Sequence, residues 1–189
     1  MRCFLLGGPE DCYEELRRDL LYDKIPVHVR KSICRRAWET GVRAACRLAD
    51  KGQIEGIRLL AEKQKLRIEI VEEDHVAGGM RFFGEYVEKP KKIILYSLSI
   101  RRFAQDCGIS HDQAEELILA HEFYHFLECT CLGRTSRQYM VPGLQWGRLS
   151  VGKNGIQALS EIGAHGFSYT YRELRYGMDV KEKKGLVLI

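Results

Sequence analysis

The chain lacks any long apolar run. No stretch approaches the roughly 18 consecutive apolar residues that a membrane-spanning helix needs, and the mean hydropathy is -0.28. The start of the chain, from Met1 to Pro9, has too short an apolar run for a secretory signal peptide. We therefore expect a protein that stays in the cytoplasm and has no membrane partner.

The sequence also lacks internal repeats, low-complexity segments and linkers rich in proline, glycine or serine; only 4 of its 189 residues are proline. Hydrophobic residues make up 45% and charged residues 30%, which is typical of soluble globular proteins. A chain of this length can bury a proper core. We expect residues 1–189 to form a single domain, with a helical part over 1–65 and the remainder of the fold over 66–189.

The sequence also lacks the patterns of two classes of protein, disulfide-stabilised proteins and nucleic-acid-binding proteins. The seven cysteines are odd in number and scattered, so a complete disulfide framework within one chain is impossible, and reduced, mostly buried thiols are expected. No RNA-recognition, zinc-finger or clear helix-turn-helix pattern is present. The net charge is only +4, and the basic cluster over residues 30–47 is interpreted as a solvated helix face rather than a nucleic-acid surface. We expect no direct nucleic-acid partner.

Local sequence patterns predict helices towards both ends of the chain and strands in the middle. Apolar spacing and charge order predict helices over residues 10–22, 27–50, 53–64, 99–106, 111–130 and 155–175. Alternating apolar and polar residues and aromatic content predict strands over residues 66–70, 80–87 and 93–96. Because a short polar turn joins the last two strands, the small sheet is expected to be mainly antiparallel. This order of elements indicates an α+β fold, and the glycine-rich stretch between the last two helices is expected to be irregular.

The strongest motif is H-E-F-Y-H, which runs from His121 to His125 and matches the pattern H-E-x-x-H. Residues four apart lie on the same face of a helix, so both imidazoles can bind one ion. Glu122 would then lie beside an open coordination position, where it can take a proton from a metal-bound water. Ser110 and Gln113 predict a capping box at the start of this helix. Burying these groups would cost several kcal/mol unless they were paired or bound to metal.

A catalytic zinc usually takes three protein ligands, and Glu161 is the best candidate for the third. It lies on the next long helix among small residues, which let that helix pack closely against a neighbour: Gly163, Ala164 and Gly166. His165 follows four residues later on the same face and could replace Glu161. We favour for His165 a hydrogen bond to a ligand or to the developing oxyanion, with packing at a helix interface as the alternative. Three other histidines are poor candidates: His28, His75 and His111.

The two motifs in this order, Leu119 to His125 and Glu161 to Ser168, resemble those of the ImmA/IrrE metallopeptidases, a gluzincin-like branch of the zincins. In that family one helix carries A-H-E-x-x-H and a later helix carries E-x-x-A-N-x-F-A. The resemblance spans roughly residues 66–175 and includes a strand ahead of the first helix. His165 stands where the family has asparagine, Ser168 stands where it has alanine, and the Leu-x-Pro ending of the family is absent.

The resemblance implies a zincin-like core over residues 66–189, with two active-site helices and the N-terminal helices added to it. It implies Zn2+ as the cofactor, bound by His121, His125 and Glu161, with Glu122 as the catalytic base. The implied activity is that of a zinc-dependent endopeptidase, which hydrolyses a peptide bond in a protein or peptide substrate. Family members often cleave transcriptional repressors or related regulators, so a transcriptional regulator is the implied kind of partner.

Two segments are candidates for binding the substrate. The strand over residues 80–87, or its neighbour, could offer an edge along which an extended peptide lies. Four side chains of the glycine-rich stretch are expected to shape the cleft: Arg134, Arg137, Tyr139 and Trp146. For Tyr139, a surface or packing role is favoured over stabilisation of an oxyanion.

Two other functions compete with hydrolysis. One is a zinc-stabilised regulatory module that binds a protein partner with little or no turnover. Structural zinc sites are commonly closed by a fourth protein ligand, which Cys129 or Cys131 would have to supply, and such a site has no need of Glu122. The other is nucleic-acid binding through residues 30–47, which predicts strongly salt-dependent affinity.

Overall fold

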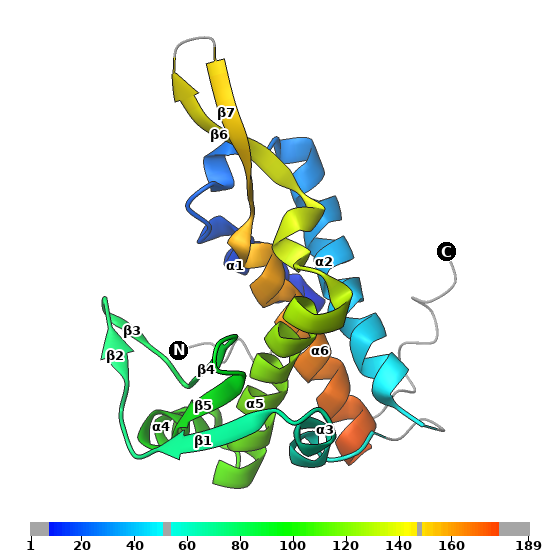
Figure 1. Ribbon diagram of the computed structural model, residues 1–189, viewed down its shortest axis with the longest axis vertical. Coiled ribbons are helices and arrows are strands. Elements are labelled where there is room, and N and C mark those ends of the chain that lie inside the picture. Colours follow the sequence, from blue (N-terminus) through cyan, green and yellow to red (C-terminus); the bar gives the residue numbers. More distant parts are fainter. Residues whose placement is uncertain (1–7, 51–53, 147–148, 178–189) are drawn as a thin grey trace.

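The computed structural model describes residues 8–50, 54–146 and 149–177, and it confirms an α+β fold. The α-helices are α1 (Cys12–Arg17), α2 (Val27–Leu48), α3 (Ile57–Lys63), α4 (Ser97–Cys107), α5 (His111–Leu127) and α6 (Gln157–Tyr176). The strands are β1 (Arg67–Val71), β2 (Val76–Ala77), β3 (Met80–Arg81), β4 (Gly84–Val87), β5 (Lys92–Tyr96), β6 (Met140–Trp146) and β7 (Leu149–Gly155). The molecule is elongated, with the β6–β7 hairpin at one end and the remaining strands, with α4, at the other (Figure 1).

The main sheet is mixed, so the expectation of a mainly antiparallel sheet is wrong. Its order is β1-β5-β4, with β1 parallel to β5 and β4 antiparallel to β5. The polar turn before β5 does join an antiparallel pair, as predicted. The long connection between β1 and β5, however, contains both β4 and a separate β2–β3 hairpin, and it brings β5 back in the direction of β1. Strand β4 therefore forms one edge of the sheet.

The strand predicted over residues 80–87 is divided in two. Its first part, β3, pairs with β2 across a turn at Gly78 and Gly79, which both have positive φ angles of 58° and 78°. Its second part, β4, pairs with β5. Aromatic residues lie along the whole of residues 80–87, which is why the sequence alone does not reveal the break.

Helix α5 lies at the centre of the molecule, as its apolar circumference predicts. The predicted capping box is confirmed at its start: Ser110 Oγ accepts from the Gln113 backbone N–H at 3.2 Å, and Gln113 Oε1 accepts from the Ser110 N–H at 3.2 Å. Phe123 and Tyr124 are each at most 1% exposed. The same core contains residues of β5, α2, α3, α4 and α6, so the sheet and five helices share one apolar cluster.

Helix α6 packs closely against both α2 and α5, because glycine lies at its contact points. A Cβ atom added to Gly41 of α2 would lie 1.9 Å from the carbonyl oxygen of Gly163. One added to Gly166 would lie 2.5 Å from the carbonyl oxygen of Trp38, and one added to Gly163 would lie 2.5 Å from the hydroxyl of Tyr124. The prediction that small residues let this helix approach its neighbour is confirmed. Figure 1 shows α2 and α6 side by side.

The stretch between α5 and α6 contains a hairpin, so the expectation of an irregular segment is wrong. Strands β6 and β7 pair antiparallel from Met140 with Gly155 to Trp146 with Leu149. Glycines and Pro142 interrupt the alternation that would have predicted these strands. The side chain of Trp146, one of the residues expected to shape the cleft, lies outside the described part of the structure.

Within the described residues, no helix combines the length and apolarity needed to cross a membrane.

The basic cluster lies on α2: Arg35 and Arg43 form ion pairs with Glu39, and Arg36 donates to the Gln138 carbonyl oxygen at 3.0 Å. Arg35, Arg36 and Arg43 are exposed, which agrees with a solvated helix face. The expectation of reduced, mostly buried thiols is wrong in part, because Cys107 is disulfide-bonded and, among the described free cysteines, Cys46 and Cys131 are exposed.

Candidate metal site

His121, His125 and Glu161 bring three potential ligand atoms to one point. The two histidines lie one turn apart on α5, and Glu161 comes from the second turn of α6. His121 Nε2 lies 3.1 Å from Glu161 Oε2 and 3.3 Å from His125 Nε2, and His125 Nε2 lies 3.6 Å from Glu161 Oε1. The predicted grouping of these three side chains is thus confirmed, and the group could hold a metal ion.

The spacing of these atoms fits a small tetrahedral ion. Zinc binds histidine nitrogen and carboxylate oxygen at about 2.0–2.2 Å, so two ligands of a tetrahedral ion lie about 3.3–3.6 Å apart. The three observed separations of 3.1, 3.3 and 3.6 Å lie at or just below that range. Two imidazoles and one carboxylate also form a ligand set that catalytic zinc sites use. The residues present therefore fit a metal ion in this position.

The pKa values of His125 and Glu161 are shifted in opposite directions. Burial alone would lower the pKa of His125, but its hydrogen bond to Glu128 and the nearby carboxylate of Glu161 hold that pKa well above the usual value. Burial alone would raise the pKa of Glu161, but the two histidines hold it well below the usual value. In the absence of metal, a proton on His125 and a negative charge on Glu161 stabilise each other.

Glu122 lies beside the three groups, under strand β4. The residue is 8% exposed, and burial raises the pKa of its carboxyl group against the opposing influence of His121 and His125. A Cβ atom on Gly84 would lie 3.1 Å from Glu122 Cγ, so glycine at this position lets the edge strand lie directly over the acid. A buried carboxylate with a raised pKa next to a potential metal position is suited to accept a proton.

Glu128 is part of the site, although sequence reasoning did not identify it. Its Oε2 atom lies 2.9 Å from His125 Nδ1, the ring nitrogen that faces away from the three potential ligand atoms. The residue is only 5% exposed, and it lies in the π-helical stretch Glu128–Leu132 that continues α5. Its position three residues after His125, on the same helix face, is a signal in the sequence that could have identified it.

His165 lies next to the site but outside the group of three. Its ring centroid is 5.1 Å from that of His121, and no hydrogen bond of the His165 ring is found within the described residues. Burial and the neighbouring His121 lower the pKa of His165 to about 3, so the ring is neutral near pH 7. The other predictions for His165, contact with an oxyanion or with a metal ligand through a hydrogen bond, stay predictions.

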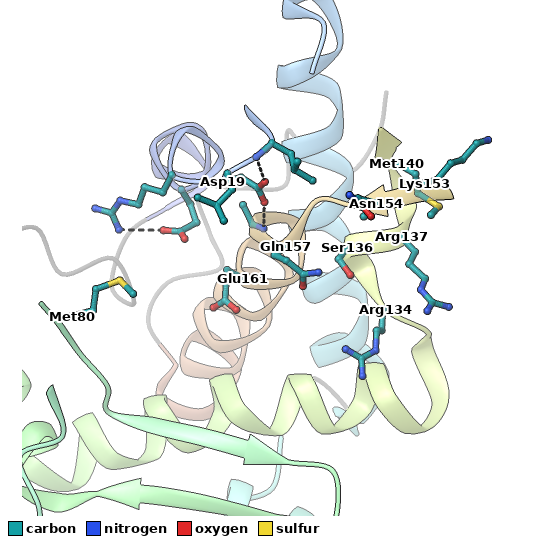
Figure 2. A pocket seen from close by; sticks show the side chains of 16 residues that line it. Asp19, Met80, Arg134, Ser136, Arg137, Met140, Lys153, Asn154, Gln157 and Glu161 are labelled. Carbon is teal, nitrogen blue, oxygen red and sulfur yellow. Dashed lines mark hydrogen bonds and ion pairs between the residues drawn. The ribbon is translucent and has the colours of Figure 1, made fainter. Parts of the chain in front are cut away.

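A cleft with a volume of about 950 Å³ opens onto Glu161. Figure 2 shows Glu161 pointing into it from α6, with Arg134 and Arg137 on one side and Met80 of β3 on the other. Two of the side chains expected to shape a cleft, Arg134 and Arg137, therefore line one. Tyr139 does not line this cleft and packs instead against the apolar cluster of α1, α2 and α6, as favoured from the sequence.

The three histidines that are poor candidates from the sequence, His28, His75 and His111, lie outside the group of three. His75 Nδ1 lies 2.7 Å from Glu73 Oε1, and its ring stacks on Tyr96 with centroids 4.4 Å apart. Neither Cys129 nor Cys131 belongs to the group of three. Within the described residues, the closed four-ligand arrangement of a structural site is therefore not formed with these cysteines.

Comparison with known proteins returns no match to a family model, a curated protein or a solved structure.

Proposed function

We propose that this protein is a zinc-dependent endopeptidase. The observation that carries the proposal is the convergence of His121, His125 and Glu161 beside the buried carboxyl group of Glu122. Three protein ligands leave a coordination position for water, as catalytic zinc sites require. The resemblance to the ImmA/IrrE metallopeptidases, with a zincin-like core over residues 66–189, supports the same reaction.

Two side chains, Glu122 and His165, have separate roles in the proposed reaction. When bound, a zinc ion polarises the scissile carbonyl group and lowers the pKa of a coordinated water. Glu122 accepts the proton of the attacking water on its carboxylate and then donates it to the nitrogen of the leaving amine. The raised pKa of the Glu122 carboxyl group suits both tasks, since a general acid–base group is most effective when its pKa is near the working pH. The neutral ring of His165, beside His121, is our candidate for a hydrogen bond to the developing oxyanion.

The substrate of the proposed reaction is an extended segment of another protein. Strand β4 has a free edge in the described sheet and lies over Glu122, so a peptide added to it would pass close to the base. The cleft around Glu161 provides space for the side chains of that peptide. We propose a transcriptional regulator in the cytoplasm as the kind of protein that is cleaved, without direct contact of this chain with nucleic acid.

The test compares proteins from cells that produce either the wild-type chain or Glu122→Gln. The variant retains all three proposed ligands, so the purified protein should still contain about one zinc ion per chain, while cleavage of its substrate should fall at least 100-fold. Newly formed peptide ends in the wild-type sample alone would identify the substrate. Full cleavage by Glu122→Gln would contradict the role of Glu122.

The same experiment separates hydrolysis from the alternative of a binding module. Equal zinc content in both proteins, together with an identical set of intact cellular proteins, would favour a zinc-stabilised module that binds a partner without turnover. Absence of zinc from the purified wild-type protein, even after incubation with zinc, would contradict both functions.

A further inference from the structure

The carboxylate of Glu128 connects the proposed metal site to two other parts of the molecule. Oε2 lies 2.9 Å from His125 Nδ1. Oε1 accepts two hydrogen bonds, one from the Thr135 backbone N–H at 2.7 Å and one from Ser160 Oγ at 2.9 Å. Glu128 is 5% exposed, Thr135 is 1% exposed and Ser160 is 8% exposed, so water does not readily replace these partners.

This geometry determines which nitrogen of His125 is free to bind a metal ion. A neutral imidazole carries one proton, on either Nδ1 or Nε2, and only the nitrogen without a proton can be a ligand. A carboxylate is solely an acceptor, so Glu128 favours the form of His125 with the proton on Nδ1. Nε2, the atom that lies 3.3 Å from His121 Nε2, is then the ligand.

We propose that Glu128 is a positioning residue for metal binding, which fixes the His125 ring and its tautomer. The inference rests on the proposed zinc site and adds a residue that the H-E-x-x-H pattern does not include. Carboxylates that accept a hydrogen bond from a ligating histidine typically change metal affinity 10- to 100-fold when they are replaced.

The same carboxylate links the two helices that supply the proposed ligands. Ser160 is adjacent to Glu161 on α6, and its Oγ atom also accepts a hydrogen bond from the Ser136 backbone N–H at 3.1 Å. Ser136 lines the cleft. Glu128 therefore holds His125 of α5, the first turn of α6 and the cleft wall around Ser136 in one hydrogen-bonded group.

Replacing Glu128 by glutamine tests the proposal because the two side chains have the same shape. A glutamine has one acceptor oxygen and one amide group that only donates. If its oxygen keeps the hydrogen bonds from Thr135 and Ser160, its amide faces His125 Nδ1 and favours the tautomer with the proton on Nε2. If the oxygen faces His125 instead, the amide opposes the N–H of Thr135. In either case the arrangement that binds metal becomes less favourable.

The experiment is a titration of purified protein with zinc alone in competition with a chromophoric chelator. We expect Glu128→Gln to bind zinc about 10- to 100-fold more weakly than the wild type. In metal-free wild-type protein at alkaline pH, NMR of the labelled imidazole should find the proton of neutral His125 on Nδ1, and in Glu128→Gln a larger share on Nε2.

Glu116→Gln is the matched control. Glu116 also accepts hydrogen bonds, from the hydroxyls of the buried Tyr171 and the exposed Tyr176, but it lies five residues before His121 on α5. This control should lower the thermal stability of the metal-free protein and leave the affinity for zinc within about twofold of the wild type. A purely structural role for Glu128 would give the same result as the control.

The outcomes separate this inference from the proposed function. Wild-type affinity for zinc in a folded Glu128→Gln protein would overturn the role of Glu128 and leave the zinc site standing. If that variant does not fold, the NMR measurement on the metal-free wild-type protein tests the inference alone. A proton on Nε2 of neutral His125 would then overturn it. A wild-type protein that binds no zinc would overturn the proposed function itself.

Discussion

Glu122 and Glu161 are two carboxyl groups whose surroundings give them different tasks. Glu161 lies against two imidazoles, which hold its pKa well below the usual value and keep it negative as a ligand must be. Glu122 lies beside the same two imidazoles, but burial is the larger influence and raises its pKa. A pair of acids whose pKa values are driven apart is a common basis for assigning a charged group and a proton-transferring group in one site.

Replacing Glu161 by alanine removes one of the three proposed ligands. We expect the zinc content of the purified protein to fall from about one ion per chain to a small fraction of that, because two imidazoles alone do not complete a catalytic site. Metal analysis after dialysis measures this. Glu15→Ala is the control, since Glu15 lines the same cleft but is not in the group of three. Unchanged zinc in Glu161→Ala would mean that His165 or another residue is the third ligand.

The affinity for zinc should rise with pH. His125 must lose its proton to become a ligand, and its pKa in the metal-free protein is well above 6.5. Zinc therefore competes with a proton at neutral pH, and the association constant should increase about tenfold per pH unit until pH exceeds the pKa of His125. Glu161 stays charged throughout this range, because its pKa is lowered. Zinc competition titrations at several pH values test the slope, and an affinity that is constant from neutral to alkaline pH would contradict it.

At the scale of the elements, the sequence predicts α5 and the potential ligands well because local rules govern them. Ser110 caps the start of α5 by accepting a hydrogen bond from the nearby Gln113 backbone N–H. The four-residue spacing of His121 and His125 places both on one face of the helix. Glu161 could be predicted only from its small neighbours and the motif resemblance. Its distance from His121 depends on how α5 and α6 cross, which is a property of tertiary packing.

The elements that the sequence does not predict depend on pairing between distant segments. The parallel pairing of β1 with β5 is decided by the path of the chain between Val71 and Lys92, and no local pattern encodes it. The β6–β7 hairpin contains glycines and a proline, which reduce its strand signal. The spacing of Glu128 from His125 is visible in the sequence, but the hydrogen bonds of its second oxygen to Thr135 and Ser160 form only when these segments come together in the fold.

The crossing of α2 and α6 should be intolerant of a single methyl group. Gly41→Ala would place Cβ against the backbone of Gly163 and Phe167, at 1.9 and 2.6 Å in the present arrangement, so the helices must separate. We expect the free energy of unfolding to fall by about 1–3 kcal/mol, although alanine is a better helix former than glycine. Chemical denaturation measures the change.

Gly56→Ala is the matched control for this prediction. At Gly56, ahead of α3, the nearest atom to an added Cβ is 3.6 Å away, which is ordinary van der Waals contact. Its effect on the free energy of unfolding should stay below about 1 kcal/mol. Equal effects of the two substitutions would contradict the close crossing of α2 with α6.

In the whole molecule, the N-terminal helices form part of the cleft. Glu15, Arg18 and Asp19 line the same cleft as Glu161, Arg134 and Arg137. Residues more than 100 positions apart in the sequence therefore line one cleft at the proposed site. The N-terminal helical part is expected to influence the binding of substrate as well as the stability of the fold.

Asp19 joins this part of the chain to the start of α6. Its Oδ2 atom accepts a hydrogen bond from the Ala158 backbone N–H at 2.9 Å, and its Oδ1 atom accepts one from the Leu21 N–H at 2.8 Å. The N–H groups at the start of a helix lack partners within it, so Asp19 caps α6 from a distant segment. Its negative charge also lies at the favourable end of the helix dipole.

Asp19→Ala should therefore affect both the fold and the site. Loss of the cap should lower the free energy of unfolding by about 0.5–2 kcal/mol, and loosening of the first turn of α6 should weaken zinc binding through Glu161. Denaturation of the metal-free protein and zinc competition measure the two effects. Asp23→Ala, in the same connection but exposed, is the control and should change neither. If Asp19→Ala lowered stability with zinc affinity unchanged, Glu161 would be positioned by α5 and α2 alone, independently of the N-terminal segment.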